Sequence, residues 1–240
     1  MKIGIAQIQS KKGDVTHNIA HHLAFIERAI EAEVDLIVFP ELSITGYEPA
    51  LAEQLATTKE DEIFEPFQKL ADTSNITIGI GMPILAKEGI YISMLLFQPM
   101  LERLVYSKKL LHEDELPFFT SGTHQPSLTI KDTDIALGIC YETLQRSHFV
   151  EAKENGAHVY VASVAKPHRG SAKAYVHFPA IAQEFQTPIL MCNAIGFCDD
   201  FVCNGQSAVW NNQGQLLGEL DDTNEGMLVY DTEMQKVLSL

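Results

Sequence analysis

The chain has 240 residues, 46% of them hydrophobic, and 32 acidic against 17 basic residues give a formal net charge of -15. This length supports a large buried core, and the acidic balance argues against nucleic acid or an anionic membrane surface as a partner. The chain has no apolar run of membrane-spanning length, and its first residues lack the apolar core of a signal peptide, so we expect a cytoplasmic protein without membrane contact.

The cysteines do not form a recognisable disulfide or zinc pattern. Four cysteines in a chain of this length are too few for a disulfide framework, so we expect free thiols. Cys192, Cys198 and Cys203 lie close in sequence, but they lack the C-x2-C spacing of structural zinc and no histidine lies between them. We therefore expect no metal site.

The first half of the chain alternates predicted strands and helices. Residues Lys2 to Ile8 alternate as a strand does, and Val15 to Glu33 has apolar residues at helical spacing. The apolar run Asp35 to Pro40 predicts a buried strand that proline ends. Residues Pro49 to Ser74 are predicted to be mainly helical, and a three-stranded meander begins at Ile76.

The second half continues the same alternation. Residues Leu128 to Cys140 predict two strands, and the helix that follows stops near Gly156. After another strand, a helix is predicted over Ser171 to Glu184, and then late strands, two of which turn at Asn211 to Gly214. These runs predict a layered α/β protein with a largely parallel sheet, to which the meanders add antiparallel neighbours. No linker divides it, so we expect one domain over residues 1–240.

Three predicted strand ends carry residues suited to chemistry, namely Glu41 in FPELSITGY, Lys108 in VYSKKLLHEDEL and Cys140 in ICYETLQ. Ligands bind at the carboxyl ends of strands in open α/β sheets. A thiol needs a base or a cation to react, and a carboxyl group in apolar surroundings is a suitable base. Lys108 and the backbone N–H of Tyr141 could hold an oxyanion. Taken singly, Glu41 could also be a carboxylate in a turn, Lys108 a solvated cation and Cys140 a buried core residue.

The stretches FPELSITGY, YSKKLLHEDELPFFTSG and GICYETL resemble the Glu, Lys and Cys motifs of the nitrilase, or carbon-nitrogen hydrolase, superfamily. The similarity runs from KIGIAQIQSKKGDVTHNI to CNAIG and GQSAVWNNQGQLLGEL. It implies a four-layer α-β-β-α sandwich, a Glu41-Lys108-Cys140 triad and no metal or organic cofactor. It also suggests a homodimer that uses the helices around Ser147 to Asn155 and Ser171 to Glu184.

Two of the motif positions allow an alternative. The lysine of the family lies two positions after a tyrosine, so Tyr106 selects Lys108. The adjacent Lys109 is the alternative, but in a strand it would face the opposite way. Members of the family often have a second glutamate that positions substrate or helps the base. Glu115 matches its spacing to FF-x-x-G better than Glu113 does, so we expect Glu115 among the catalytic residues.

The resemblance also points to substrate-binding residues. We expect Tyr141, Glu142 and Tyr47 to line the oxyanion and substrate-binding part of the site, where Glu142 replaces the aspartate of many relatives. Substrate choice is expected in the loops Tyr47–Leu51, Glu113–Phe119, Gln145–His148 and Ala165–Arg169. Four basic residues could bind a substrate carboxylate or be solvated surface charges, and they are Arg146, Lys166, His168 and Arg169.

The predicted function is hydrolysis of a non-peptide carbon-nitrogen bond in a small linear amide, through a cysteine thioester. Carbamoyl amines or nitriles as substrates of the same triad are alternatives, as is a non-catalytic binding subunit of the same fold. A papain-like pair of Cys140 with His112 or His168 is disfavoured by the order of the motifs.

Overall fold

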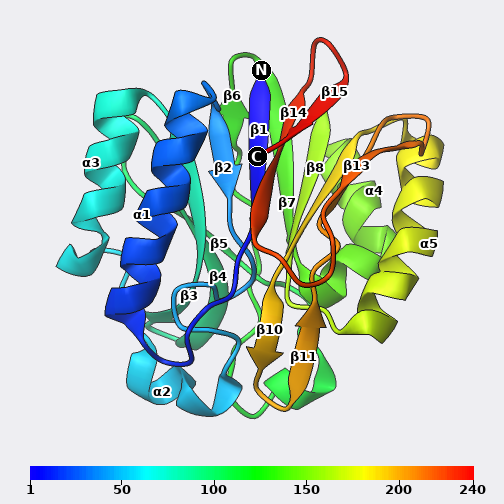
Figure 1. The fold of residues 1–240 in the computed structure, drawn as a ribbon. Helices are drawn as coiled ribbons and strands as arrows, with labels where there is room; N and C mark the ends of the chain where they lie inside the picture. Colours follow the sequence, from blue (N-terminus) through cyan, green and yellow to red (C-terminus); the bar gives the residue numbers. More distant parts are fainter.

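The computed structural model describes residues 1–240 as an α/β protein built as a four-layer α-β-β-α sandwich (Figure 1). Two β-sheets pack face to face, and helices cover their outer faces. The predicted fold class is confirmed.

The first sheet has the strand order β15-β14-β1-β2-β3-β4-β5. Its strands are β1 (Lys2–Gln7), β2 (Leu36–Val38), β3 (Thr77–Ala86), β4 (Gly89–Phe97), β5 (Leu104–Ser107), β14 (Gly226–Asp231) and β15 (Lys236–Ser239). Strand β2 pairs in parallel with β1 and β3, and every other neighbouring pair is antiparallel.

The second sheet has the strand order β13-β12-β9-β8-β7-β6. Its strands are β6 (Thr129–Ile130), β7 (Thr133–Ile139), β8 (Val159–Val164), β9 (Ile189–Asn193), β12 (Ala208–Trp210) and β13 (Leu216–Glu219). Strand β8 pairs in parallel with β7 and β9, and the outer pairs are antiparallel.

The expectation of a largely parallel sheet is wrong, because each sheet has only a parallel centre. In the first sheet, the meander adds β4 and β5 on one side and the end of the chain adds β14 and β15 on the other. Antiparallel neighbours need only short connections, whereas parallel ones need a crossover. The parallel centre is the part that matters for the site, since its strands end at one edge.

Helices α1 (Val15–Glu31) and α3 (Glu65–Ser74) cover the first sheet, whereas α4 (Arg146–Glu154) and α5 (His168–Phe185) cover the second (Figure 1). Five short helical segments complete the chain, namely η1 (Pro49–Leu51), α2 (Ala52–Leu55), η2 (Glu62–Phe64), η3 (Glu113–Glu115) and η4 (Cys140–Leu144). No helix has the length and apolar character needed to cross a membrane.

Two helix predictions differ from the structure. The region Pro49 to Ser74 is broken into four short elements, because the chain is extended at Ala56 and Thr57 forms a bridge with Ile84 of β3. Helix α5 begins at His168, earlier than the predicted Ser171, directly after Pro167.

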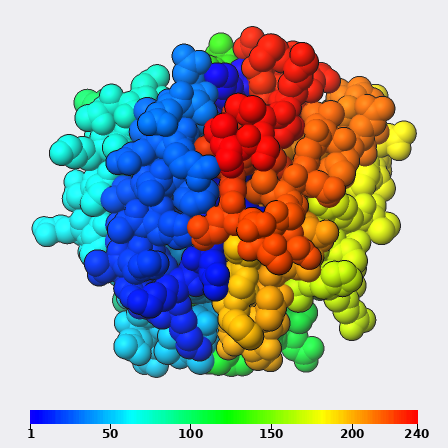
Figure 2. All heavy atoms as spheres, in the orientation of Figure 1, coloured from blue at the N-terminus to red at the C-terminus, as the bar shows by residue number.

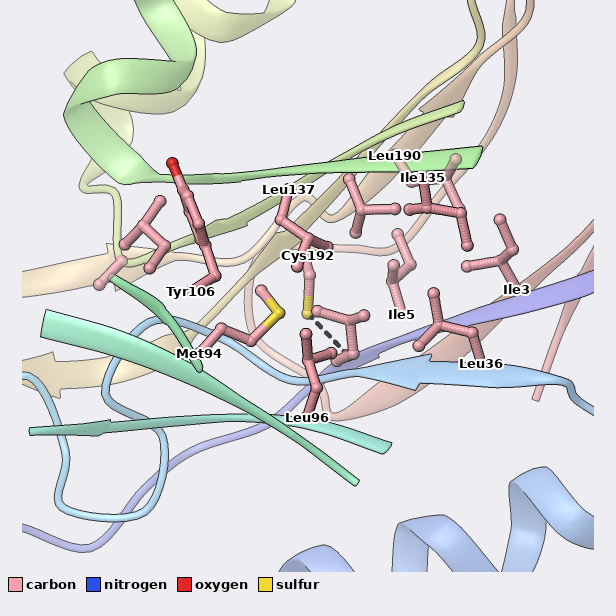
Figure 3. Close-up of a cluster of buried hydrophobic side chains, with 14 of the residues drawn as sticks. Ile3, Ile5, Leu36, Met94, Leu96, Tyr106, Ile135, Leu137, Leu190 and Cys192 are labelled. Carbon is pink, nitrogen blue, oxygen red and sulfur yellow. Dashed lines mark hydrogen bonds between the residues drawn. The ribbon is translucent and has the colours of Figure 1, made fainter. Parts of the chain in front are cut away.

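The core between the sheets consists of side chains that point inward from both (Figure 3). Ile5 of β1, Leu137 of β7 and Leu190 of β9 are fully buried there. Cys192 belongs to this core, where its thiol donates to the carbonyl oxygens of Ala6 and Val38 at 3.2 Å each. Packing of this kind between sheets removes apolar surface from water and fixes how their strand ends align.

A hairpin of β10 (Ile195–Cys198) and β11 (Phe201–Asn204) lies outside the two sheets, at the same end of the molecule as α2 (Figure 1). Its Cys198 and Cys203 are free thiols whose sulfur atoms are 2.8 Å apart. The backbone N–H of Asn204 donates to the carbonyl oxygen of Lys166 at 2.9 Å, which attaches the hairpin to the segment after β8.

The two ends of the chain lie side by side on one face of the molecule (Figure 2). Strands β1 and β14 pair antiparallel along their whole lengths. The backbone N–H of Gln9 extends this contact by donating to Glu225 Oε1 at 2.8 Å. The last strands therefore complete the sheet that the first strand begins.

Candidate active site

The structure brings the predicted site residues together where strands end. Glu41 lies in the turn after β2, Lys108 follows β5, and Cys140 follows β7. The ammonium of Lys108 lies between two carboxylates, 2.8 Å from Glu41 Oε1 and 2.6 Å from Glu115 Oε1. Exposure is 2% for Glu41, 0% for Lys108 and 1% for Glu115, so this ion-pair cluster is enclosed.

The turn that carries Glu41 lies directly on β3. A side chain at Gly81 would place its Cβ 2.3 Å from the backbone nitrogen of Leu42, so only glycine permits this approach. The hydroxyl of Ser43 bonds to the backbone N–H of Gly81 at 3.2 Å and to the buried ring of His22 at 2.8 Å. Burial lowers the pKa of His22 to about 3, so a neutral imidazole supports the turn.

Lys108 is held by backbone contacts on both sides. Its N–H donates to the carbonyl oxygen of Ile92, and its carbonyl oxygen accepts from the N–H of Gly122, both at 2.8 Å. A Cβ at Gly122 would lie 2.2 Å from the carbonyl oxygen of Ser107, so this segment needs glycine to pack here. Lys109 points the other way and pairs with Glu151, as strand alternation predicts.

Of the two candidate second glutamates, only Glu115 reaches the cluster. Its Oε1 also accepts from the hydroxyl of Tyr47 at 2.9 Å, and its Oε2 accepts from the backbone N–H of His112 at 2.7 Å. Glu113 is exposed. Tyr47, which we expected to bind substrate, is buried and orients Glu115 through this hydrogen bond.

Cys140 sits on a sharp bend between β7 and η4. Its backbone has φ of 46°, a left-handed conformation that residues other than glycine rarely adopt. The side chain is partly exposed, and its sulfur lies 3.7 Å from both the Ala165 carbonyl oxygen and Lys166 Nζ. Strain of this kind is common at functional positions, and here it holds the thiol at the strand end.

Glu142 is engaged by protein groups on both carboxylate oxygens. Oε1 accepts from the N–H of Ile139 at 2.8 Å and from the hydroxyl of Tyr106, and Oε2 accepts from the N–H groups of Lys109 at 2.7 Å and Leu110 at 3.1 Å. It is fully buried. This placement favours a positioning role that ties the lysine loop to the cysteine bend, rather than the predicted contact with substrate.

Burial and the neighbouring charges shift the pKa values of the site residues in opposite directions. Burial raises the pKa of Glu41 to about 7, although the Lys108 ammonium acts in the opposite direction. Burial and the Glu41 charge raise the pKa of Cys140 to about 11, whereas Lys166 and Lys108 lower it. Burial alone would lower the pKa of Lys108, but the charges of Glu41, Cys140 and Glu115 outweigh it and the pKa is raised. The resting thiol therefore keeps its proton and needs a base such as Glu41.

The unpaired oxygen of Glu41 fits that task. Lys108 binds Oε1, whereas Oε2 is buried without a hydrogen-bond partner. A buried polar atom of this kind is costly unless it binds a ligand or a proton.

The geometry does not support a papain-like pair of Cys140 with a histidine. His112 and His168 are both exposed, and neither bonds to Cys140.

The remaining predicted residues lie at different depths. Tyr141 is 38% exposed beside His112, so its side chain lies at the surface, although the residue directly follows Cys140. Arg146 pairs with Glu184, whereas His168 and Arg169 are exposed. Lys166 differs from the other three basic candidates, because it is only 4% exposed and is therefore not a surface charge.

The wide hollows of the surface lie elsewhere. The principal ones measure about 460 to 630 Å³, and none is lined by Glu41, Lys108, Glu115 or Cys140. Of the residues at the site, Glu41, Lys108 and Glu115 are enclosed, whereas Cys140 is partly exposed.

Comparison with known sequences reveals relatives along the whole chain. The model of the family described as carbon-nitrogen hydrolase matches residues 2–240. A probable nitrilase from Schizosaccharomyces pombe is 25% identical over 98% of this chain and 90% of its own length. A glutamine-dependent NAD(+) synthetase from Acinetobacter baylyi is 22% identical over 98% of this chain, which spans only 44% of that protein.

Solved structures show the same architecture. A cysteine-to-alanine mutant of the amidase from Nesterenkonia sp. AN1, in complex with butyramide, matches with a TM-score of 0.88 and 25% identity, covering 98% of this chain and 92% of that one. Another structure of that amidase shows Michael addition of acrylamide at its active-site cysteine, with a TM-score of 0.87, 26% identity and coverage of 96% and 92%. The chain therefore belongs to the carbon-nitrogen hydrolase family of the nitrilase superfamily, and it is an enzyme that acts on carbon-nitrogen bonds.

Proposed function

We propose that this carbon-nitrogen hydrolase is an amidase for small linear amides, with Glu41, Lys108 and Cys140 as its catalytic triad and no cofactor. The observation that carries the proposal is the enclosed ion-pair cluster of Glu41, Lys108 and Glu115 beside the strained Cys140. The similarity to an amidase that binds butyramide supports amides over other carbon-nitrogen compounds. One domain over residues 1–240 carries this proposed activity.

In the first half of the reaction, Glu41 Oε2 accepts the thiol proton of Cys140 as the sulfur attacks the amide carbonyl carbon. A carboxyl group with a pKa near 7 is a suitable acceptor at neutral pH. The carbon–sulfur bond forms, and the carbonyl oxygen becomes an oxyanion.

The oxyanion is held by Lys108 and by the backbone N–H of Tyr141. An ammonium has three N–H donors, and two of those of Lys108 point at Glu41 and Glu115. The third remains for the substrate oxygen. A donor fixed in place before the reaction stabilises the developing charge without reorganisation.

In the second half, the carbon-nitrogen bond breaks and Glu41 returns its proton to the departing ammonia. A water molecule then gives a proton to Glu41 and attacks the thioester, which releases the carboxylic acid and returns the proton to Cys140. Glu115 contacts Lys108 throughout, and we assign it a positioning role.

Release of ammonia from a panel of small amides, carbamoyl amines and nitriles tests this proposal. We expect hydrolysis of amides such as butyramide, and none by Cys140→Ala with its fold retained by circular dichroism. Preferred release from a carbamoyl amine or nitrile would reassign the substrate. No release from any of the three classes would favour a binding subunit, and turnover by pure Cys140→Ala would refute the triad.

We further propose a homodimer through helices α4 and α5. Most apolar residues of α5, including Phe178 and Ile181, pack on the second sheet, whereas Val176 is 77% exposed. Val176 is thus an apolar residue of α5 that does not pack on the sheet, and we place the contact with a second copy there.

A further inference from the structure

Lys166 is a second buried cation at the nucleophile. It lies beyond the end of β8 and is only 4% exposed. Its Nζ is 3.1 Å from the carbonyl oxygen of Cys140 and 3.7 Å from the sulfur. The side chain therefore contacts the atom that reacts in the proposed mechanism.

The position of Lys166 is fixed by its backbone. Its N–H donates to Asn193 Oδ1 at 2.8 Å, and its carbonyl oxygen accepts from Asn193 Nδ2 at 3.2 Å. The N–H of Asn204 in β11 donates to the same carbonyl oxygen at 2.9 Å. Contacts from β9 and from the hairpin thus hold the residue at the site.

The ammonium of Lys166 has no carboxylate partner. It takes part in none of the ion pairs of the structure, whereas Lys108 contacts two carboxylates. A buried charge without a counter-charge is strongly unfavourable. Neutral acceptors such as the Cys140 carbonyl oxygen compensate only part of that cost, so a negative charge on the sulfur 3.7 Å away would be stabilised.

Formal charges show which anion fits. Glu41, Glu115 and Lys108 together carry one net negative charge, which opposes ionisation of the thiol. Lys166 brings the group to neutrality. When the proton moves from Cys140 to Glu41, a thiolate replaces a carboxylate as the second anion and the sum stays at zero.

We propose that Lys166 provides the counter-charge of the Cys140 thiolate. The two lysines then have separate tasks, since Lys108 orients Glu41 and receives the oxyanion while Lys166 stabilises the sulfur anion. The inference deepens the proposed function and rests on it in one respect, the identity of Cys140 as nucleophile.

The rate of Cys140 alkylation by iodoacetamide, followed by mass spectrometry between about pH 7 and 12, tests the inference in the full chain. In Lys166→Met, the midpoint of the pH-rate profile should rise by one pH unit or more, so that alkylation at pH 8 slows at least about tenfold. Lys166→Arg should restore the rate to within about threefold, because it keeps the charge.

Lys109→Met is the matched control, because it removes a neighbouring lysine that pairs with Glu151 rather than with Cys140. Its midpoint should equal that of the unmodified protein. Thermal unfolding distinguishes a role of Lys166 in packing from its role as a counter-charge. Lys166→Met replaces an unpaired charge by an apolar chain and should not lower the unfolding temperature.

An unchanged midpoint in Lys166→Met would overturn the inference. If the midpoint is unchanged and the variant loses activity only on substrates with a carboxylate, Lys166 binds substrate and the inference is likewise overturned. Alkylation requires no turnover, so the proposed function fails separately, through absence of ammonia release from the unmodified protein.

Discussion

The side chains of the site are individually unusual in their protonation. Glu41 is a buried carboxyl group with a pKa near 7, and it faces a thiol whose pKa is raised to about 11. A thiol with this pKa is protonated at neutral pH, whereas a carboxyl group with a pKa near 7 is a suitable proton acceptor there. Together they form a proton donor and an acceptor within one enclosed group, which is the condition for general base catalysis.

This protonation predicts the pH dependence of activity. In the proposed mechanism Glu41 must be ionised to accept the thiol proton, and its ionisation increases with pH. The value of kcat/KM for an amide should therefore rise through about pH 7 and fall roughly tenfold for each unit further below it. Steady-state rates from about pH 5 to 9 measure the profile. An acid limb centred near pH 4.5 would mean that Glu41 behaves as an ordinary solvated carboxyl group.

At this scale, the sequence predicted some placements and not others. Strand alternation and the position of Tyr106 separated Lys108 from Lys109, and the spacing to FF-x-x-G selected Glu115 over Glu113. The burial of Lys166 had no sequence signal, because His168 and Arg169 follow it in the same predicted loop and a lysine in such a loop is usually solvated. Its burial depends on contacts from β9 and β11, which are distant in sequence.

At the scale of elements, Glu142 joins two loops that come from different sheets. Its carboxylate binds the start of η4 through Ile139 and the segment after β5 through Lys109 and Leu110. The bend at Cys140 and the segment after Lys108 therefore share one acceptor group. Displacement of that group would move Lys108 relative to Cys140.

Glu142→Gln should therefore reduce both stability and activity. The amide nitrogen cannot accept hydrogen bonds, so at least one buried donor loses its partner, at a cost of about 1 to 3 kcal/mol. Urea unfolding measures the loss, and ammonia release measures the activity. Glu113→Gln is the control because Glu113 is exposed, and it should change neither quantity. Equal stability of Glu142→Gln and the unmodified protein would show that this carboxylate holds nothing in place.

Element prediction failed where strands are short. The hairpin β10–β11 was not predicted, because each strand has only four residues and Phe197 and Val202 face solvent at 78% and 52% exposure. Strand β15 was also missed, since it pairs only with β14 at the sheet edge. Such elements depend on pairing with distant segments rather than on their own periodicity.

At the scale of the whole molecule, the sandwich aligns two parallel centres that belong to separate sheets. The order of strands and helices predicted the layered class, but not how the sheets divide the strands, because the parallel and antiparallel neighbours of a strand are set by long-range contacts. The hydroxyl of Ser163 in β8 bonds across the sheets to the carbonyl oxygen of Phe39 at 2.8 Å, close to the Glu41 turn.

The proposed dimer is testable at this scale. Light scattering coupled to size-exclusion chromatography should give twice the chain mass of 26.7 kDa. Val176→Glu should shift the protein toward the monomer, because it places a charge on the proposed contact. Leu101→Glu is a control on an exposed apolar residue far from α5 in sequence, with 59% exposure. A monomeric mass for the unmodified protein would contradict the proposal.

The left-handed backbone at Cys140 has a consequence for stability. A Cβ in that conformation costs about 1 to 2 kcal/mol, and glycine escapes the penalty. Cys140→Gly should thus resist urea better than Cys140→Ala by about 1 kcal/mol, although neither has a sulfur atom. Greater resistance of the alanine variant would show an unstrained bend. If the difference is found, a side chain at position 140 lowers the stability of the fold relative to glycine. The cysteine is then explained by its reactivity rather than by folding.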